Sequence, residues 1–179
     1  TRFWDYNRFM LNIRHATPAD AALLAELGRR TFYDSFAADN TPETMAAYLA
    51  GAFSPQKQAA ELADPGTLFL LVEDDGQTAG YARLKAGPAP ACISGIRPLE
   101  IVRFYACQEW IGKGVGARLM QACIDEAKQR RADVLWLDVW EKNPRAIAFY
   151  HKWGFTVVGE QGFQMGEELQ HDLLMQRQV

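Results

Sequence analysis

Three glycines at alternate positions in Ile111-Gly112-Lys113-Gly114-Val115-Gly116 form the pattern in this chain that most clearly indicates chemistry. Because glycine has no Cβ, the backbone of this stretch can approach a bound anion closely. A helix that begins directly after it points unpaired N–H groups and its positive dipole end at the same place. The pattern therefore predicts a phosphate-binding loop suited to a pyrophosphate, and Lys113 and Arg118 could add positive charge.

Other interpretations of the same stretch have different requirements. A plain glycine-rich turn between a strand and a helix remains an alternative. A P-loop NTPase needs Gly-Lys followed by Ser or Thr, after an earlier spaced Gly, and this combination is missing. Gly112, Gly114 and Ala117 match the GxGxxA pattern of dinucleotide-binding folds, with Asp138 about twenty residues later. That pattern normally opens its domain, whereas here about a hundred residues precede it.

A second group of residues follows a strongly apolar stretch at Val134–Trp140. Asn143-Pro144 caps a short helix in which Asn143, Ile147 and Tyr150 recur at spacings of four and three, so they share one face. A strand that leads into the phosphate loop and a later helix that ends in Tyr150 can enclose one extended ligand between them.

Apolar patterns and turn residues predict the elements that position these groups. Thr17-Pro18 and Thr41-Pro42 are helix starts, each with a hydroxyl cap before a proline. The Asp75-Gly76 pair predicts a hairpin turn. Strands are expected at 11–15, 67–73, 78–85, 99–106, 134–140, 155–159 and 171–175, and helical stretches after 17, near 41, over 55–63, from about 113 and after 143.

This order predicts an α/β fold with a mixed, mostly antiparallel central sheet of about seven strands flanked by about four helices. A length of 179 residues fits one domain with a real core. We expect residues 10–179 to form that single domain. Residues 1–9 are expected to be an N-terminal extension, because Met10 followed by Leu-Asn-Ile-Arg is typical of a natural start.

The composition excludes several classes of protein. A net charge of −3 argues against a nucleic-acid binder, since such domains are basic. No apolar run approaches the ~20 residues that a membrane span needs. Cys92, Cys107 and Cys123 lack metal-ligand spacing, and their odd number indicates reduced thiols in a cytoplasmic protein. The three histidines are scattered through the chain, so no metal site is expected.

The loop and the later helix together resemble the GNAT superfamily of N-acetyltransferases, and the element order is similar to its fold from Leu11 to the end. The family loop reads Gln/Arg-x-x-Gly-x-Gly/Ala. Gly114 and Gly116 match it, whereas Ile111 stands where Gln or Arg is usual, and its backbone N–H could still serve. The pattern Asn-x-x-Ala-x-x-Phe-Tyr over 143–150, followed by Gly-Phe, recurs at the family's distance.

The C-terminal part resembles one branch of this family more narrowly. The stretch Leu-Trp-Leu-Asp-Val-Trp-Glu-Lys-Asn over 135–143 and the ending Gly159…Phe163…Gly166…Asp172-Leu173 are similar to the PaiA-type branch, which acetylates polyamines.

The family resemblance implies roles for particular residues. Backbone groups of Phe104, Tyr105 and Ala106 would hold the pantetheine arm of acetyl-coenzyme A (acetyl-CoA) and polarise its thioester carbonyl, while residues 111–116 hold the pyrophosphate. Asn143 would contact the cofactor, and Lys152 would lie near its phosphates. Tyr150 would protonate the departing thiolate.

Acetyl transfer needs a neutral amine, a polarised carbonyl and a proton for the leaving sulfur. Tyr150, with an ordinary pKa of about 10, suits a thiolate whose thiol has a pKa of about 8.5. Glu100 is the candidate base, acting through water. Its even spacing from Phe104 and Ala106 predicts a common face, and it matches the strand position of the general-base glutamate in the family's histone-acetylating members. A carboxylate paired with Arg103 or simply solvated remains the alternative.

Four further residues are candidates for binding the acceptor. Tyr33, Asp34 and Phe36, with Glu141, could form an acidic and aromatic pocket of the kind that cationic amines prefer, although a solvated helix face is an alternative. We therefore expect direct attack by a small-molecule primary amine, with polyamines implied by the branch, in a monomer or homodimer. The competing functions are a non-catalytic acyl-CoA sensor and a peptide or protein N-acetyltransferase, which needs an open groove.

Overall fold

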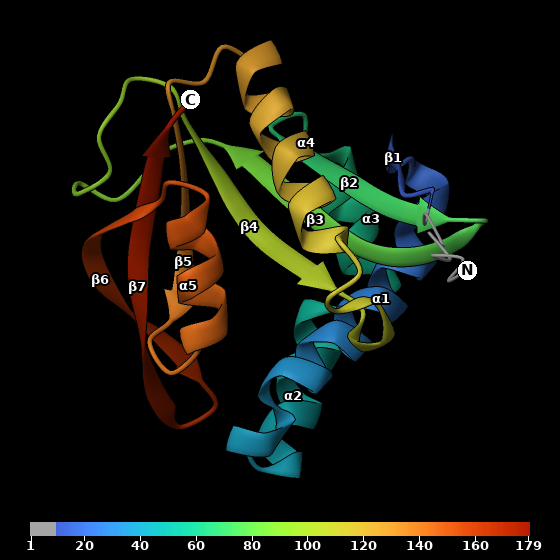
Figure 1. Ribbon diagram of the computed structural model, residues 1–179. Coiled ribbons are helices and arrows are strands. Elements are labelled where there is room, and N and C mark those ends of the chain that lie inside the picture. Colours follow the sequence, from blue (N-terminus) through green and yellow to red (C-terminus); the bar gives the residue numbers. More distant parts are fainter. Residues whose placement is uncertain (1–9) are drawn as a thin grey trace, which may run out of the picture.

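The structure is a computed structural model that describes residues 10–179, so the extension expected at 1–9 lies outside the described residues. Its seven strands form one sheet in the order β1-β2-β3-β4-β5-β7-β6 (Figure 1). The β4–β5 pair is parallel and every other pair is antiparallel. The expectation of a mixed, mostly antiparallel seven-stranded sheet is confirmed.

The elements follow the expected order. The strands are β1 Asn12–His15, β2 Thr67–Asp74, β3 Gln77–Ala86, β4 Pro98–Ala106, β5 Val134–Trp140, β6 Thr156–Met165 and β7 Glu168–Gln178. The helices are α1 Ala21–Phe36, α2 Pro42–Ala52, α3 Pro55–Ala63, α4 Val115–Gln129 and α5 Pro144–Lys152, with short 3₁₀ helices at Pro18–Asp20, Ala37–Asp39 and Gln108–Trp110. All five helical stretches expected along the chain are α-helices, one more than the overall expectation of about four, and β6 and β7 extend beyond their expected ends. The added residues of β6 mostly alternate between exposed and half-buried, and those of β7 are mainly polar, so both leave a weak apolar signal in the sequence.

Local sequence explains where the helices begin. The Thr41 hydroxyl accepts a hydrogen bond from the Thr44 N–H at 3.2 Å at the start of α2. The Ser54 hydroxyl accepts one from the Lys57 N–H at 3.1 Å at the start of α3. In each case a proline follows the cap, where a missing N–H costs nothing because it would have no helical partner.

The β2–β3 hairpin closes through the expected Asp-Gly pair. Asp75 has φ = 46° and Gly76 has φ = 77°, so both central residues adopt the left-handed region. A two-residue turn of this kind matches the right-handed twist of the strands that it joins. The hairpin fixes the register of β3, and β3 in turn pairs with β4, the strand that matters most for the site.

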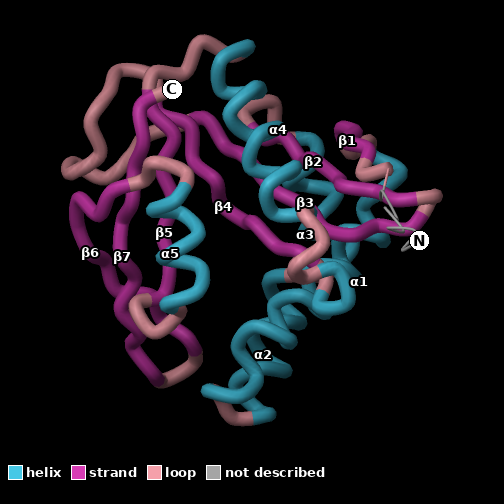
Figure 2. The backbone as a smooth tube through the Cα atoms, in the orientation of Figure 1, coloured by secondary structure: helices cyan, strands magenta, loops and turns pink. Residues whose placement is uncertain are grey.

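Helices cover both faces of the sheet (Figures 1 and 2). Helices α4 and α5 lie on one face, and α1 and α3 lie on the other. On α1, a Cβ at Gly28 would stand 2.3 Å from the Phe53 ring, so the close approach of α1 to the end of α2 requires glycine. Phe32, Met45, Phe53 and Met165 form a second small core that joins α1 and α2 to the end of β6. Within residues 10–179, every helix is too short or too polar to cross a membrane.

Candidate active site

Strands β4 and β5 pair over only part of their length and then separate. Their register runs from Pro98 opposite Val134 to Glu100 opposite Trp136. Beyond these residues β4 continues to Ala106 and β5 to Trp140, and the two ribbons diverge in Figures 1 and 2. Over this splayed segment, residues 101–106, the edge of β4 that faces β5 has no ladder partner in the described chain. Its backbone groups can therefore bind an extended ligand.

The glycine loop lies at the end of this splayed segment. Gly112 has φ = 81° and Gly114, the residue before α4, has φ = 86°. A Cβ at Gly112 or Gly114 would meet no described atom within 4 Å, so the space beside both residues is open. No side chain within the described residues caps the first turn of α4, which leaves its N–H groups directed at that space. This arrangement fits a phosphate group.

Other groups of the loop are already engaged. The Ile111 N–H donates to the Gln108 carbonyl at 3.2 Å, which contradicts the expectation that this N–H could serve a ligand. The Lys113 N–H donates to the Trp110 carbonyl at 3.2 Å, and the Lys113 ammonium lies 5.1 Å from the Trp110 ring centre. The anion site therefore depends on Gly112 and on residues from Gly114 onward.

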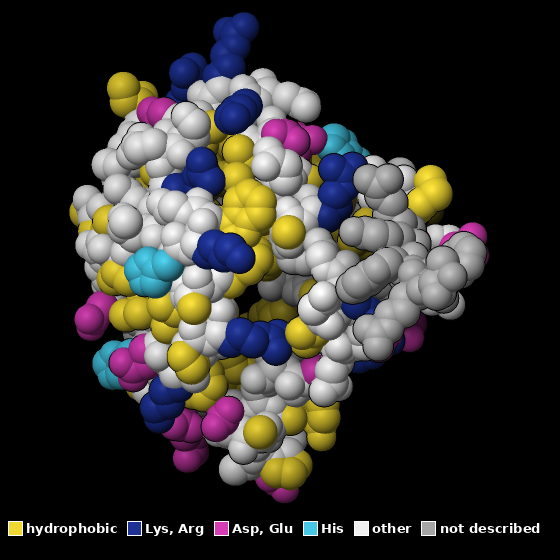
Figure 3. Space-filling view, in the orientation of Figure 1, with side chains coloured by type: hydrophobic (Ala, Val, Ile, Leu, Met, Phe, Trp, Pro, Cys, Tyr) yellow, Lys and Arg dark blue, Asp and Glu magenta, His cyan; other side chains and the backbone are white. Residues whose placement is uncertain are grey.

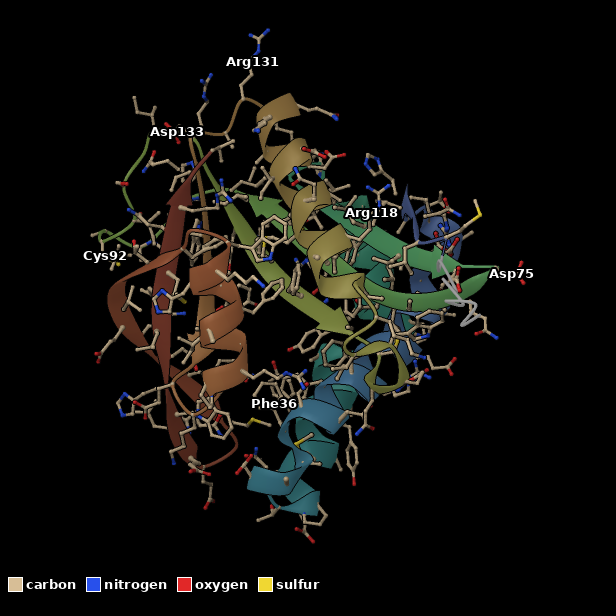
Figure 4. All side chains as sticks on the ribbon, viewed as in Figure 1. Phe36, Asp75, Cys92, Arg118, Arg131 and Asp133 are labelled. Carbon is tan, nitrogen blue, oxygen red and sulfur yellow. The ribbon has the colours of Figure 1, made fainter. Side chains whose placement is uncertain are left out.

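Basic side chains lie around a hollow in this face of the molecule. Figure 3 shows the hollow between α5 and α4, with Lys and Arg side chains at its rim. Arg118 projects from α4 on the side of β2 (Figure 4), and its Nε donates to the Leu11 carbonyl at 3.4 Å. Arg118 is thus directed toward the start of the chain, and Lys152 on α5 is exposed.

Besides Lys152, the N-cap residue Asn143 and Tyr150 of α5 are expected site residues. The Asn143 side chain accepts a hydrogen bond from the Ala146 N–H at 3.1 Å, so its oxygen caps the helix. Only its amide N–H₂ is left for a ligand. Tyr150 lies near the other end of α5 and is 8% exposed. Its ring packs against Phe104 of β4, with centroids 6.0 Å apart, and against Phe155 at 5.8 Å. Tyr150 therefore stands beside the splayed segment, as expected.

Burial changes the acid chemistry of Tyr150. Removal from water raises the pKa of its hydroxyl well above the usual value of about 10, because the phenolate is poorly solvated there. The expectation of an ordinary pKa is wrong for this form of the protein. The phenol is therefore fully protonated at neutral pH and carries a proton that it can donate.

A bulge in β4 overturns the expected placement of Glu100. Leu84 of β3 lies opposite Ile101 and Arg83 lies opposite Arg103, so Val102 has no partner. The extra residue shifts the alternation of side chains by one. Glu100 therefore lies on the opposite face from Phe104, which corrects the prediction of a common face.

Glu100 is half-buried beside other ionisable groups. Burial and, to a smaller extent, the negative charge of Asp138 raise the pKa of Glu100 to about 7. The positive charges of Arg83 and Lys85 partly offset this increase. Arg103 does not pair with Glu100, because its guanidinium binds Glu61 instead. A carboxyl group with a pKa near neutrality, at the point where β4 leaves β5, can exchange protons under physiological conditions.

Two further acids, which the sequence did not single out as site residues, lie on the same face as Glu100. Asp138 of β5 accepts a hydrogen bond from Gln161 of β6 at 3.0 Å. Asp172 of β7 is 8% exposed. Burial and its hydrogen bond and repulsion with Asp138 raise the pKa of Asp172 to about 7. An aspartate inside the apolar stretch 134–140 was the signal that could have identified Asp138.

The four residues expected to bind the acceptor have different surroundings. Phe36, labelled in Figure 4, reaches the splayed strands, and its ring centroid lies 5.9 Å from that of Trp140. Tyr33 is 54% exposed, and Asp34 and Glu141 are exposed as well. The structure therefore brings Phe36 to the site and leaves the other three on the surface. The face of the sheet that carries Glu100 also has an aromatic side, formed by Phe36, Trp140, Tyr48 and Phe163.

Comparison with known proteins agrees with this geometry. Residues 29–155 match the Acetyltransferase (GNAT) family. An uncharacterized N-acetyltransferase from Lactobacillus delbrueckii subsp. lactis is 34% identical over 151 residues, which cover 84% of this chain and 87% of that protein. The chain therefore belongs to the GNAT family of acetyltransferases and is an acetyl-CoA-dependent N-acetyltransferase.

Solved structures share the fold. The PaiA N-acetyltransferase of Thermoplasma acidophilum, in complex with coenzyme A, superposes with a TM-score of 0.75 at 22% identity, over 94% of this chain and 99% of that one. The protein yncA of Salmonella typhimurium, with its cofactor acetyl-CoA, gives a TM-score of 0.65 at 24% identity, over 94% of this chain and 93% of that one. Among the described residues, no cluster of three or more His, Cys, Asp or Glu side chains is arranged to hold a metal ion.

The residues present fit acetyl-CoA. The open space beside Gly112 and Gly114 and the uncapped first turn of α4 suit its phosphates. The free edge of β4 suits the amide groups of its pantetheine arm, which need donors and acceptors along an extended path.

Proposed function

We propose that the enzyme acetylates a primary amine of a small, multiply charged cation, and that polyamines are its acceptor class. The observation that carries the proposal is the group of three carboxyl side chains, Glu100, Asp138 and Asp172, on one face of the separated strands. Two of them have pKa values of about 7 because burial and mutual repulsion disfavour their charged forms. A bound ammonium group would relieve that repulsion, so a polycation is the ligand that this face favours.

Aromatic side chains support the same acceptor class. Phe36 and Trp140 lie beside the acids, and aromatic faces attract ammonium groups. Tyr48 and Phe163 extend this wall, with ring centroids 5.9 Å apart. An acidic site with an aromatic wall positions a polyamine chain by charge and by contact with its methylene groups.

For the reaction, we propose direct attack of the amine in a ternary complex. Acetyl-CoA supplies the acetyl group. Glu100, on the acceptor face, takes a proton from the incoming ammonium through water, since its pKa of about 7 suits a base near neutral pH. Tyr150, on the opposite face, holds a proton for the departing thiolate. Backbone groups of Phe104, Tyr105 and Ala106 orient the thioester between them.

In this proposal the phosphates rest on the loop at 112–116, and Asn143 offers its amide N–H₂ to the cofactor. The likeness to PaiA stands at 22% identity and supports the fold alone. The choice of polyamines therefore depends on the three acids, and a peptide amine is the competing acceptor.

A panel of acceptors tests the proposal. Spermidine, spermine, a neutral amine, amino acids, aminoglycosides and peptides are compared by release of free thiol from acetyl-CoA. We expect the highest kcat/KM with spermidine or spermine, and a preference that shrinks as salt screens the acids. The double variant Asp138→Asn with Asp172→Asn should lose about tenfold or more in kcat/KM for spermidine. The matched control is Glu160→Gln, an exposed acid on the other face of β6, which should leave it unchanged.

Two results would contradict the acceptor class. Faster turnover with peptides than with polyamines would identify a peptide N-acetyltransferase. No acetylation of any polyamine at millimolar concentration would exclude polyamines and leave the acetyltransferase assignment intact.

We also propose a cytoplasmic location. Cys92 carries an exposed free thiol, and Cys107 and Cys123 carry buried free thiols, which suit a reducing compartment. Cell fractionation with an antibody against the chain tests this directly.

A further inference from the structure

A buried ion cluster joins α3 to β3 and β4. Glu61 of α3 accepts a hydrogen bond from Arg83 of β3 at 3.0 Å. It also accepts two from Arg103 of β4, at 2.7 and 3.1 Å, one to each carboxylate oxygen. The three side chains are 8%, 10% and 12% exposed, in the order Glu61, Arg83, Arg103. One carboxylate thus holds two guanidinium groups from adjacent strands in a region largely removed from water.

Arg103 makes more contacts with the helices than Arg83 does. Its Nη1 also donates to the Gln58 side chain at 3.2 Å, and its guanidinium carbon lies 4.9 Å from the Phe53 ring centre. Arg83 leaves its Nε without a hydrogen-bond partner among the described residues. The cluster therefore ties β4 to α3 and to the end of α2 more firmly than it ties β3.

The contacts of Arg103 with α3 matter because of where Arg103 lies on β4. The last paired residues of β4 and β5 are Glu100 and Trp136, and the bulge at Val102 follows. Arg103 is the first residue after the bulge, so its contacts with α3 act where β4 departs from β5. An unpaired strand edge tends to pair with a neighbouring strand, and β5 is that neighbour.

We propose that Glu61 and Arg103 are positioning residues for acetyl-CoA, because their ion pair holds the bulged segment of β4 against α3 and keeps its edge open toward the cofactor. The inference rests on the proposed placement of the cofactor along β4. Arg83 binds the same carboxylate from β3, a strand that is paired on both sides by β2 and β4. Its loss should not change the course of β4.

A matched pair of substitutions tests this. Arg103→Met and Arg83→Met each remove one guanidinium and leave a one-to-one ion pair with Glu61, so the remaining buried charge is balanced in both. Affinity for coenzyme A is measured by calorimetry well below the unfolding temperature, with thermal unfolding recorded for each variant. We expect Arg103→Met to weaken binding about tenfold and Arg83→Met to stay within about twofold of the wild type.

Equal losses in the two variants, or no loss in Arg103→Met, would overturn the inference. If Arg103→Met fails to fold, Arg103→Lys replaces it, because lysine keeps the charge but cannot bridge both carboxylate oxygens. A loss of about threefold is expected there, and unchanged affinity would also overturn the inference. Gly116→Val distinguishes a failure of the positioning role from a failure of the proposed cofactor placement. If it weakens coenzyme A binding while Arg103→Met does not, only the positioning role fails, and if neither does, the proposed cofactor placement fails too.

Discussion

Glu100 and Phe104 lie on the same strand at an even spacing, yet their side chains point to opposite faces of the sheet. The bulge at Val102 separates them. Phe104 packs against Tyr150 on the face covered by α5, whereas Glu100 lies near Asp138 on the other face. In the proposed reaction, this arrangement places the proton donor for sulfur and the proton acceptor for the amine on opposite sides of one strand. The two groups can then act at once without neutralising each other.

Substitution of Gly116 tests the phosphate site. Its φ lies outside the left-handed region, so valine fits the backbone, and a Cβ would stand 3.4 Å from the Phe149 ring, an ordinary contact. Gly116→Val should therefore fold and yet weaken coenzyme A binding about 100-fold, because its side chain would occupy space needed by the pyrophosphate. Calorimetry measures the affinity.

The control is Gly51→Val on α2, another helical glycine, whose Cβ would meet nothing within 4 Å. It should leave the affinity unchanged. Full affinity in Gly116→Val would remove the loop from the site.

The features of the site that could be predicted from the sequence are local ones. The glycine loop and the cap at Asn143 depend on a few consecutive residues, and the structure places both at the separated strands. The face of Glu100 could not be predicted, because a bulge leaves no trace in the alternation of a half-buried strand. Asp172 comes near Asp138 only through the pairing of β5 with β7. Such contacts depend on register across distant segments, which a single sequence does not reveal.

Removal of the Tyr150 hydroxyl tests its role as the acid. Tyr150→Phe keeps the ring contacts with Phe104 and Phe155. We expect kcat to fall about 10²-fold with little change in coenzyme A affinity, the scale typical of losing a general acid. Steady-state kinetics and calorimetry measure the two effects. The matched control is Tyr81→Phe, which removes another buried hydroxyl from β3 and should leave kcat near the wild-type value. Wild-type turnover in Tyr150→Phe would mean that water or another group protonates the thiolate.

The pH dependence of the rate tests Glu100. Because burial and Asp138 raise its pKa to about 7, kcat/KM should increase with pH up to about 7 and then level off until the amine titrates. Glu100→Gln should lower the rate near neutral pH and remove the ascending limb of the pH profile, which is the increase of kcat/KM up to about pH 7. Part of the activity should return at high pH, where free amine is abundant. Asp138→Asn removes a negative charge that disfavours ionisation, so the limb should move to lower pH. A Glu100→Gln profile parallel to the wild type would exclude Glu100 as the base.

The stability of the fold tests the environment of Asp172. Burial, with repulsion from Asp138, raises its pKa from 3.8 to about 7, while His171 partly offsets the shift. The folded state therefore binds this proton more tightly than the unfolded chain does. The stabilisation of the fold by this bound proton is complete below pH ~3.8 and is lost as the pH rises from there through about 7. Above pH 7 the charged carboxylate is a net cost to the fold.

Asp172→Asn removes that charge, and its amide can donate a hydrogen bond to Asp138 in place of the lost proton. Relative to the wild type, the variant should gain stability at pH 8 and gain less at pH 5. The difference should be on the order of 1 kcal/mol, or roughly 2–4 °C in Tm for a domain of this size. Thermal unfolding followed by circular dichroism at both pH values measures it. Asp75→Asn, in the exposed β2–β3 turn, changes the net charge equally and should show no such difference. If Asp172→Asn shifts Tm by the same amount at pH 5 and pH 8, Asp172 does not titrate between them, and the argument that a bound ammonium relieves repulsion at this carboxyl fails.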